Sequence, residues 1–452
     1  MGKSITRDMT SGSPAKLIIK FAIPMLIGNL FQQLYSIIDS VVVGRFVDSN
    51  ALAAVGATGS LVFMVIGICF GLSAGISIVI SQYFGAGDHD KVRKSFVTAT
   101  YIVIGAAILL GIVGFLSTRF LLELLNTPDT IIDQSEIFMK ITFAGVLGTA
   151  CYNGIAAVLR ALGDSVTPLK FLVVSCVINI LLDLLFVLVF HWNVPGVALA
   201  TVISQIISAV GCIIYAMTKV KLLRVPIKEW KPDWEIFAKC FRLGIPVALQ
   251  NFLISVSMIA LQRVINNYNE VVIAANTVVI RIEQLVLQPG MSIGAALSAF
   301  AGQNIGAGRI DRAKSGLKSA SLIIIVFSLA MLPVMYFGGE YIMLLFTKKE
   351  FIEVVNTGVR AIHITCFFYS AVGMIFVTRN FLSGVGDINI PMAMGFTEVI
   401  CRITFAILFT VWIGYTGIWW ATGVNWFLTA LVGIFRVLSG KWQNKSIINH
   451  SR

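Results

Sequence analysis

The chain has 452 residues, of which 57% are hydrophobic and only 12% are charged. Soluble domains carry about 25% charged residues, so this composition excludes a soluble protein and leaves a polytopic membrane protein. The net charge of +12 would suggest a nucleic-acid partner in a soluble chain. In a membrane chain Lys and Arg gather in the cytoplasmic loops, so no nucleic acid is expected.

Twelve apolar stretches follow one another along the chain, and each is long enough to cross a bilayer as a helix. The sixth and seventh are separated by a basic stretch that contains Pro226 and Pro232. We therefore expect an N-terminal six-helix lobe over residues 1–220, a cytoplasmic basic linker over 221–240 and a C-terminal six-helix lobe over 241–452. The predicted spans cover residues 15–44, 51–82, 96–118, 137–159, 168–190, 197–218, 241–262, 271–301, 316–338, 359–382, 390–412 and 417–436.

Four short motifs recur in the same order in both halves, at spacings of 221 to 223 residues. Matches at one spacing indicate an internal duplication. Six spans per half is an even number, so both halves enter the membrane from the same side. The pseudo-twofold axis should run along the membrane normal, with a ligand site between the halves as in transporters. The repeated pairs are Ile23-Pro24 and Ile245-Pro246, Gln82 to Gly87 and Gln303 to Gly308, Gly163-Asp164 and Gly386-Asp387, and Gly196 and Gly417.

The basic residues also predict an orientation. With both termini on the inner side, about 25 of the 34 Lys and Arg residues fall in cytoplasmic segments, and the opposite topology reverses that ratio. Only Arg281 and Arg402 are expected within spans. We therefore expect a multi-pass protein of the plasma (inner) membrane with a cytoplasmic N-terminus and C-terminus.

The first span carries an acid, Asp39, close to its outer end. An ionisable group inside a spanning helix costs on the order of 3 kcal/mol, so it usually has a function. At about 1.5 Å per helical residue, Asp39, Asp183 and Thr201 fall in one layer of the outer leaflet. Asn179 lies one turn before Asp183 on the same face, whereas Asn153 is expected to lie deeper.

Two carboxylates that meet away from water cannot both ionise at low cost. One takes up a proton, or both surround a cation such as Na⁺ together with neighbouring amide and hydroxyl oxygens. The predicted cation-coupling residues are Asp39, Asn153, Asn179, Asp183 and Thr201, and Asp39 and Asp183 would be the metal ligands if the ion is Na⁺. The alternative is that the two acids only hydrogen-bond helices together.

The second half does not repeat this arrangement, because the position that matches Asp39 falls at Leu261 or Gln262. It carries Arg281, Glu283 and Gln284 in the eighth span instead. Glu283 could contact a cationic substrate or be neutralised by a neighbour. Glu398 and Arg402 are four residues apart, and we expect them to form an ion pair.

Methionines and aromatic rings on the spans nearest the expected cleft suit a site for lipophilic cations. The predicted substrate-binding residues are Gln33, Tyr35, Met64, Met258, Glu283 and Met291.

Several other classes of function find no support in the sequence. The seven cysteines lie mostly in apolar runs and give no disulfide framework, and the four histidines have no metal-ligand spacing. No phosphate-binding loop or nucleophile motif is present, so an integral membrane enzyme is only a remote alternative. We expect no cofactor, and transport must draw on an ion gradient. A channel is disfavoured by the duplication and the one-sided acid site.

Six sequence motifs are spread along the chain: IPMLIGNLFQQLYSIIDSVVVG from Ile23, ALAAVG from Ala51, QYFGAG from Gln82 and its repeat QNIGAG from Gln303, LRALGD from Leu159 and PGVALAT from Pro195. With these motifs the chain resembles the multidrug and toxic compound extrusion (MATE) family, and the resemblance covers nearly all of it.

The resemblance implies twelve helices in two six-helix lobes that export cationic drugs in exchange for H⁺ or Na⁺. It also implies that Asp39, Asn153, Asn179, Asp183 and Thr201 match the N-lobe acidic site of one branch. The chain lacks the acids that other branches keep in helices seven and ten.

A lipid-linked oligosaccharide or lipid-precursor flippase of the same superfamily is the nearest rival. Its pyrophosphate cargo calls for a more cationic cleft. The expected partners are therefore cationic small molecules and the lipid bilayer, for a monomeric antiporter linked to antibiotic resistance.

Overall fold

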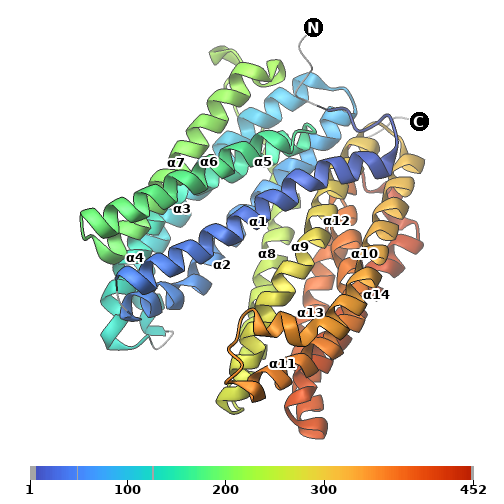
Figure 1. The fold of residues 1–452 in the computed structure, drawn as a ribbon. Coiled ribbons are helices and arrows are strands. Elements are labelled where there is room, and N and C mark those ends of the chain that lie inside the picture. Colours follow the sequence, from blue (N-terminus) through green and yellow to red (C-terminus); the bar gives the residue numbers. More distant parts are fainter. Residues whose placement is uncertain (1–6, 48, 125–126, 449–452) are drawn as a thin grey trace. The chain divides into compact units, whose positions relative to one another are not determined.

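The computed structural model describes residues 7–47, 49–124 and 127–448, and within these ranges it contains helices and no strand. Contacts divide the chain into two compact units. Unit 1 comprises residues 1–8 and 23–248, and unit 2 comprises residues 9–22 and 249–452. The first part of α1 therefore groups with unit 2, and the first part of α8 with unit 1 (Figure 1).

The helices of the first half are α1 (Pro14–Phe46), α2 (Ser49–Gly85), α3 (His89–Leu124), α4 (Asp129–Ala144), α5 (Val146–Ala161), α6 (Val166–Leu184) and α7 (Asn193–Lys219). Those of the second half are α8 (Trp234–Ile265), α9 (Glu270–Gly306), α10 (Ile310–Leu344), α11 (Ile352–Thr365), α12 (Tyr369–Val385), α13 (Asn389–Ile413) and α14 (Gly417–Leu438).

Each predicted span coincides with a helix or with a helix pair, so the all-helical expectation is confirmed. The fourth span consists of α4 and α5, which meet at Gly145 with a bend of 46°. The tenth consists of α11 and α12, which are separated by one 3₁₀ turn, Cys366–Phe368. By length and apolarity alone, nine segments of the described residues qualify as spans, or ten with the bent pair. One of them joins α13 and α14, and α9 is not among them.

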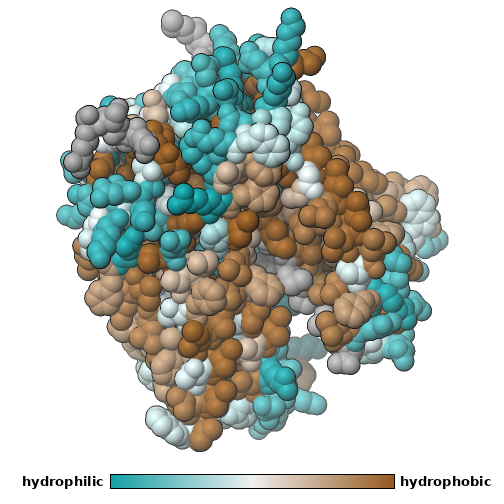
Figure 2. Space-filling model, turned by 180° about the vertical axis from the view of Figure 1, so that it is seen from behind, coloured by the Kyte–Doolittle hydropathy of each residue, from teal (hydrophilic) through white to brown (hydrophobic). Residues whose placement is uncertain are grey.

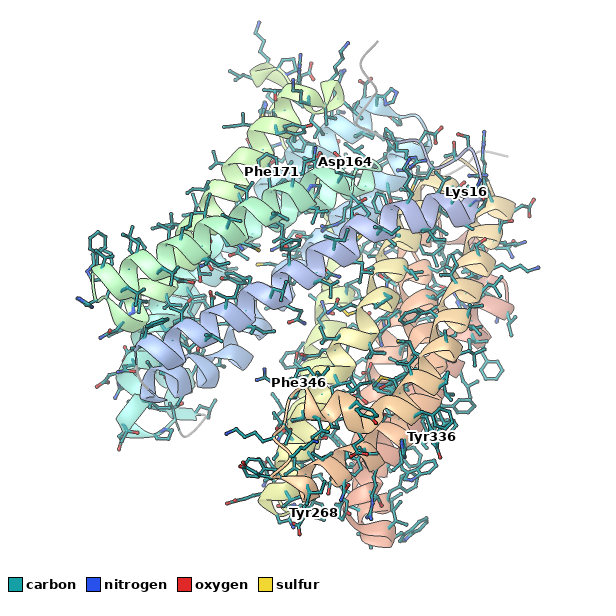
Figure 3. The ribbon with its side chains drawn as sticks, in the orientation of Figure 1. Lys16, Asp164, Phe171, Tyr268, Tyr336 and Phe346 are labelled. Atoms are coloured by element: carbon teal, nitrogen blue, oxygen red, sulfur yellow. The ribbon has the colours of Figure 1, made fainter. Side chains whose placement is uncertain are left out.

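The repeated glycines end helices in both halves. Gly87 and Gly308 follow α2 and α9 with φ of +73° and +71°, a left-handed conformation that only glycine adopts at low cost. Asp164, labelled in Figure 3, begins α6 by accepting hydrogen bonds from the backbone N–H groups of Val166 and Thr167. These motifs therefore shape the turns, as their position at helix ends predicted.

Small residues set how closely helices approach inside unit 1. A Cβ atom added to Gly75 of α2 would lie 2.5 Å from the Cys240 carbonyl oxygen and 2.6 Å from the Gly244 nitrogen of α8. Gly71, one turn earlier, has the backbone of Ala248 at the same 2.5 Å. This is the close packing through small side chains that stabilises helix pairs in membranes.

Apolar residues fill the interior of unit 2 and also cover much of the protein surface. A cluster of buried side chains in unit 2 joins all the helices from α8 to α14, and it includes Met343 of α10, Ile362 of α11 and Trp419 of α14. Figure 2 shows broad hydrophobic areas on the face it presents. Such a surface is expected where lipid, and not water, is the surrounding solvent.

Candidate functional site

The two acids of the first half meet inside unit 1. Asp39 lies on α1, and Asp183 lies in the last turn of α6. Their carboxyl groups hydrogen-bond to each other, and Asp39 also bonds with the hydroxyl group of Tyr35. The Asp183 residue is 0% exposed. Two carboxyl groups can share a hydrogen bond only if one of them holds a proton, so this contact has the geometry of an acid pair with one shared proton.

Hydroxyl and amide groups surround the acid pair. The Tyr35 hydroxyl donates to Thr201 Oγ1 at 3.0 Å, and the Asn179 side-chain amide donates to the same oxygen at 3.5 Å. Thr201 lies on α7, so the cluster joins α1, α6 and α7. Four of the five predicted coupling residues, Asp39, Asn179, Asp183 and Thr201, therefore lie together, as their common depth suggested.

The helix that carries Asp183 changes its backbone form directly after that residue. α6 ends at Leu184 and continues as a π-helix, Leu185–Val189. Such π segments often occur at functional sites because they leave backbone groups outside the regular ladder. The equivalent helix of the second half, α13, is continuous from Asn389 to Ile413. The irregularity thus accompanies the acid and not the fold in general.

Tyr35, which we expected to bind substrate, lies between Asp39 and Thr201. Its role in substrate binding stays a prediction. The contact with Asp39 was foreseeable from the sequence, because Tyr35 precedes Asp39 by four residues and therefore shares its helix face.

Asn153 is not joined to this cluster by any contact of the described residues. Its side-chain amide donates to the Thr149 carbonyl on its own helix at 2.8 Å. Its proposed part in coupling stays a prediction.

Two predicted substrate-binding residues belong to the first half. The side chain of Met64 lies outside the described part of the structure, and Gln33 is half-buried on α1.

Unit 2 contains a buried ionic network around Glu398. Glu398 Oε1 accepts from Arg402 at 3.2 Å, which confirms the expected pair, and Oε2 accepts from Arg379 at 2.9 Å. Arg379, on α12, is only 8% exposed. We did not predict Arg379 in this network, because it lies near the end of its predicted span, where a basic residue is usual.

The other predicted substrate residues of the second half differ in exposure. Met258 and Met291 are 56% and 44% exposed, and Arg281 is exposed. Glu283 has a carboxyl oxygen, Oε1, that is buried and has no hydrogen-bond partner among the described residues. Both roles considered for Glu283 stay predictions.

Comparisons with known proteins agree with the fold and with the duplication. The MatE family model matches twice, at residues 24–185 and 246–408, so the two matches begin at the paired prolines Pro24 and Pro246. A probable multidrug resistance protein of Bacillus subtilis, YpnP, is 31% identical over 96% of this chain and 97% of its own length. The multidrug export protein MepA of Staphylococcus aureus is 25% identical over 93% of both chains.

A solved structure described as the outward-facing conformation of a multidrug resistance MATE family transporter superposes with a TM-score of 0.91. Its sequence is 21% identical, and the match covers 99% of this chain and 100% of the other, so the likeness is one of fold. The family model spans most of both halves, and the relatives match along almost the entire chain. The chain therefore belongs to the multidrug and toxic compound extrusion family of membrane transporters.

Proposed function

We propose that this transporter exports lipophilic organic cations in exchange for protons, by alternating access, and that Asp39 and Asp183 carry the exchanged proton. The observation that supports this most strongly is the hydrogen bond between the carboxyl groups of Asp39 and the buried Asp183 in unit 1. A pair of acids that share one proton gains or loses charge when that proton moves. Export of a cation needs such a change if proton entry is to drive it.

Na⁺ is the second candidate for the coupling ion. Both carboxyl groups, the Thr201 hydroxyl and the Asn179 amide could supply oxygen ligands to it. Na⁺ would need both acids ionised and turned toward one centre, whereas the geometry here brings the acids into contact with each other. This contact favours the proton.

The proposed cargo follows from the names of the relatives and from the chemistry of the chain. YpnP and MepA are described as a multidrug resistance protein and a multidrug export protein. Exposed methionines such as Met258 and Met291 offer soft apolar contacts, and Glu283 could offer a negative charge.

The excess of Lys and Arg in alternate loops supports a plasma (inner) membrane location with both termini cytoplasmic. We propose a monomer that needs no cofactor.

The test uses purified protein in liposomes with ethidium as cargo. A pH gradient and then an Na⁺ gradient are imposed on separate samples, and uphill ethidium movement is followed by fluorescence. The proposal expects transport with the pH gradient and none with the Na⁺ gradient. Asp39→Asn and Asp183→Asn should abolish the uphill movement, because neither Asn can hold the proton.

Asp311→Asn is the matched control, since the Asp311 side chain is fully exposed at the start of α10 and makes one loose ion pair, 3.9 Å from Lys314. It should transport as the unmodified protein does. Uphill transport at the original rate in both acid variants would overturn the coupling assignment. Uphill transport driven by the Na⁺ gradient alone would replace the proton by Na⁺.

A further inference from the structure

The connection between α7 and α8, residues 220–233, is a folded part of unit 1, and we call it the α7–α8 linker. It contains two 3₁₀ turns, Lys221–Leu223 and Ile227–Glu229. Its side chains Val220 and Leu223 are 3% and 0% exposed. A connection that buries apolar side chains in this way holds a defined shape, so its remaining side chains form a surface of fixed composition.

The α7–α8 linker is attached to the helix α3. The Tyr101 hydroxyl donates to the Trp230 carbonyl at 3.1 Å, and the Asp233 backbone N–H donates to Thr98 Oγ1 at 3.0 Å. The rings of Trp230 and Phe96 also meet edge to face, with 6.3 Å between their centroids. The three α3 residues lie at the start of the predicted span 96–118. The linker therefore lies at the depth where that span enters the membrane.

The linker presents positive charge that no acid of its own balances. Residues 219–231 contain five basic residues and one acid, Glu229, which gives a net charge of +4. Arg224 donates to backbone carbonyl groups at the end of α7. Across the described residues the other four basic side chains form no ion pair, and the acids that follow, Asp233 and Glu235, already pair with lysines outside this segment. The four exposed lysines are Lys219, Lys221, Lys228 and Lys231.

Two large apolar side chains stand among these lysines. Ile227 is 90% exposed and directly precedes Lys228, and Trp234, the first residue of α8, is 73% exposed. At the depth of the membrane boundary such side chains contact the ends of the acyl chains, and tryptophan is typical of this layer. A lysine beside them can extend its charged end to the headgroups while its apolar stem stays in the boundary.

We propose that the α7–α8 linker is a binding surface for anionic phospholipid headgroups. Lys228 and Lys231 contact the headgroup phosphates, and Ile227 and Trp234 enter the acyl-chain boundary. Phosphatidylcholine carries its own positive charge beside the phosphate, whereas phosphatidylglycerol does not, so unpaired lysines favour the second lipid. Basic clusters next to a membrane surface attract anionic lipids in this way. A soluble acidic protein would match the lysines, but it would leave the two apolar side chains at membrane depth without a contact.

The segment that follows the last helix of the second half has a different surface. It carries Lys441 and Lys445, but its tryptophan, Trp442, is 2% exposed and packs against Phe381 with 4.8 Å between ring centroids. Lysines alone therefore stand there without an exposed tryptophan beside them. The combination of unpaired lysines with exposed apolar side chains belongs to the α7–α8 linker.

Quenching by brominated lipids tests the inference on the full chain in liposomes, without cargo. A bimane fluorophore is attached at Ile227→Cys, and Cys151→Ser and Cys401→Ser remove the two native cysteines that are not buried. The liposomes contain equal amounts of phosphatidylcholine and phosphatidylglycerol, and only one of the two lipids carries bromine. We expect brominated phosphatidylglycerol to quench at least about twice as strongly as brominated phosphatidylcholine.

Charge removal assigns this preference to the lysines. Lys228→Gln combined with Lys231→Gln should bring the ratio of the two quenching values close to one. The matched control is Lys348→Gln combined with Lys349→Gln, which removes two exposed lysines from the loop between α10 and α11. Three predicted spans separate that loop from the linker, so it lies on the opposite face of the membrane and the ratio should be kept. Salt at about 1 M should lower the ratio, because it screens charges beyond about 3 Å.

A second label position shows whether the preference is local. A fluorophore at Val411→Cys, a side chain of α13 that is 77% exposed, should be quenched equally by both lipids. All the positions changed in the linker are exposed, and a monodisperse size-exclusion peak shows that each variant is folded.

Equal quenching of the label at position 227 by both lipids would overturn the inference, because the linker would then touch the bilayer without selecting anionic headgroups. Quenching by iodide in the water and by neither lipid would also overturn it, because the linker would then lie above the membrane. A ratio that survives the removal of Lys228 and Lys231 would contradict the assignment to these lysines. None of these results depends on the cargo or on the coupling ion.

Discussion

The ion network around Glu398 allows a stability prediction with a definite size. Glu398 and Arg402 have side chains that are 8% and 4% exposed, and Arg379 is 10% exposed, so water screens none of the three well. The change Glu398→Gln keeps the shape but leaves two arginine charges without their counter-charge. Breaking a buried ion pair by removing one partner costs about 3–5 kcal/mol. We expect a loss of that size, because both carboxylate oxygens are engaged.

The assay is thermal unfolding in detergent micelles, followed by the loss of the monodisperse peak in size-exclusion chromatography. Glu340→Gln is the matched control, and an exposed position of this kind should change the stability by no more than about 0.5 kcal/mol. The double variant Glu398→Gln, Arg402→Met should recover part of the lost stability, because it removes one of the two arginine charges that Glu398 balanced. Equal melting curves for Glu398→Gln and the unmodified protein would refute the reasoning.

Three further predictions follow from other contacts. Gly75→Leu should prevent folding, because the new side chain would clash with the α8 backbone. Gly56→Leu, on the same helix, is the control and should be expressed normally, because an added Cβ there has nothing within 4 Å. A monodisperse Gly75→Leu protein would contradict the packing. Arg436→Met should lower the melting temperature by breaking the 2.6 Å pair with the buried Asp387, and an unchanged melting curve would show that the pair adds nothing. Arg119 pairs with Glu123, Asp133 and Glu136 at distances of 2.8 to 3.0 Å. Arg119→Gln should therefore destabilise the protein at neutral pH and much less in acid, where the carboxylates are protonated, and an equal effect at both would refute this.

The long apolar stretches and the paired motifs were enough to predict the helices. The break inside the tenth span could not be predicted, because Thr365, Cys366 and Tyr369 are all compatible with a continuous helix. The position of the break depends on how other helices pack against these residues, and a single sequence does not show that packing. The bend at Gly145 carried a weak signal in the glycine itself.

The candidate site in unit 1 was largely predictable, because the depth of a residue in the membrane can be estimated by counting residues from the end of its span. Counting residues from the outer ends placed Asp39, Asp183 and Thr201 in one layer, and the structure brings them together. The direction in which a side chain points around its helix axis is harder to predict. Tyr35 turned toward the acids, and Arg379 turned inward to Glu398, which no count along one helix reveals.

Proton movement during transport tests the coupling claim most directly. Liposomes that contain the protein and a trapped pH-sensitive dye are given ethidium, and the internal pH is recorded as the cargo crosses the membrane. The account predicts a proton flux opposite to the ethidium flux in the unmodified protein, and none in Asp39→Asn or Asp183→Asn. An undiminished opposite proton flux in both variants would contradict it.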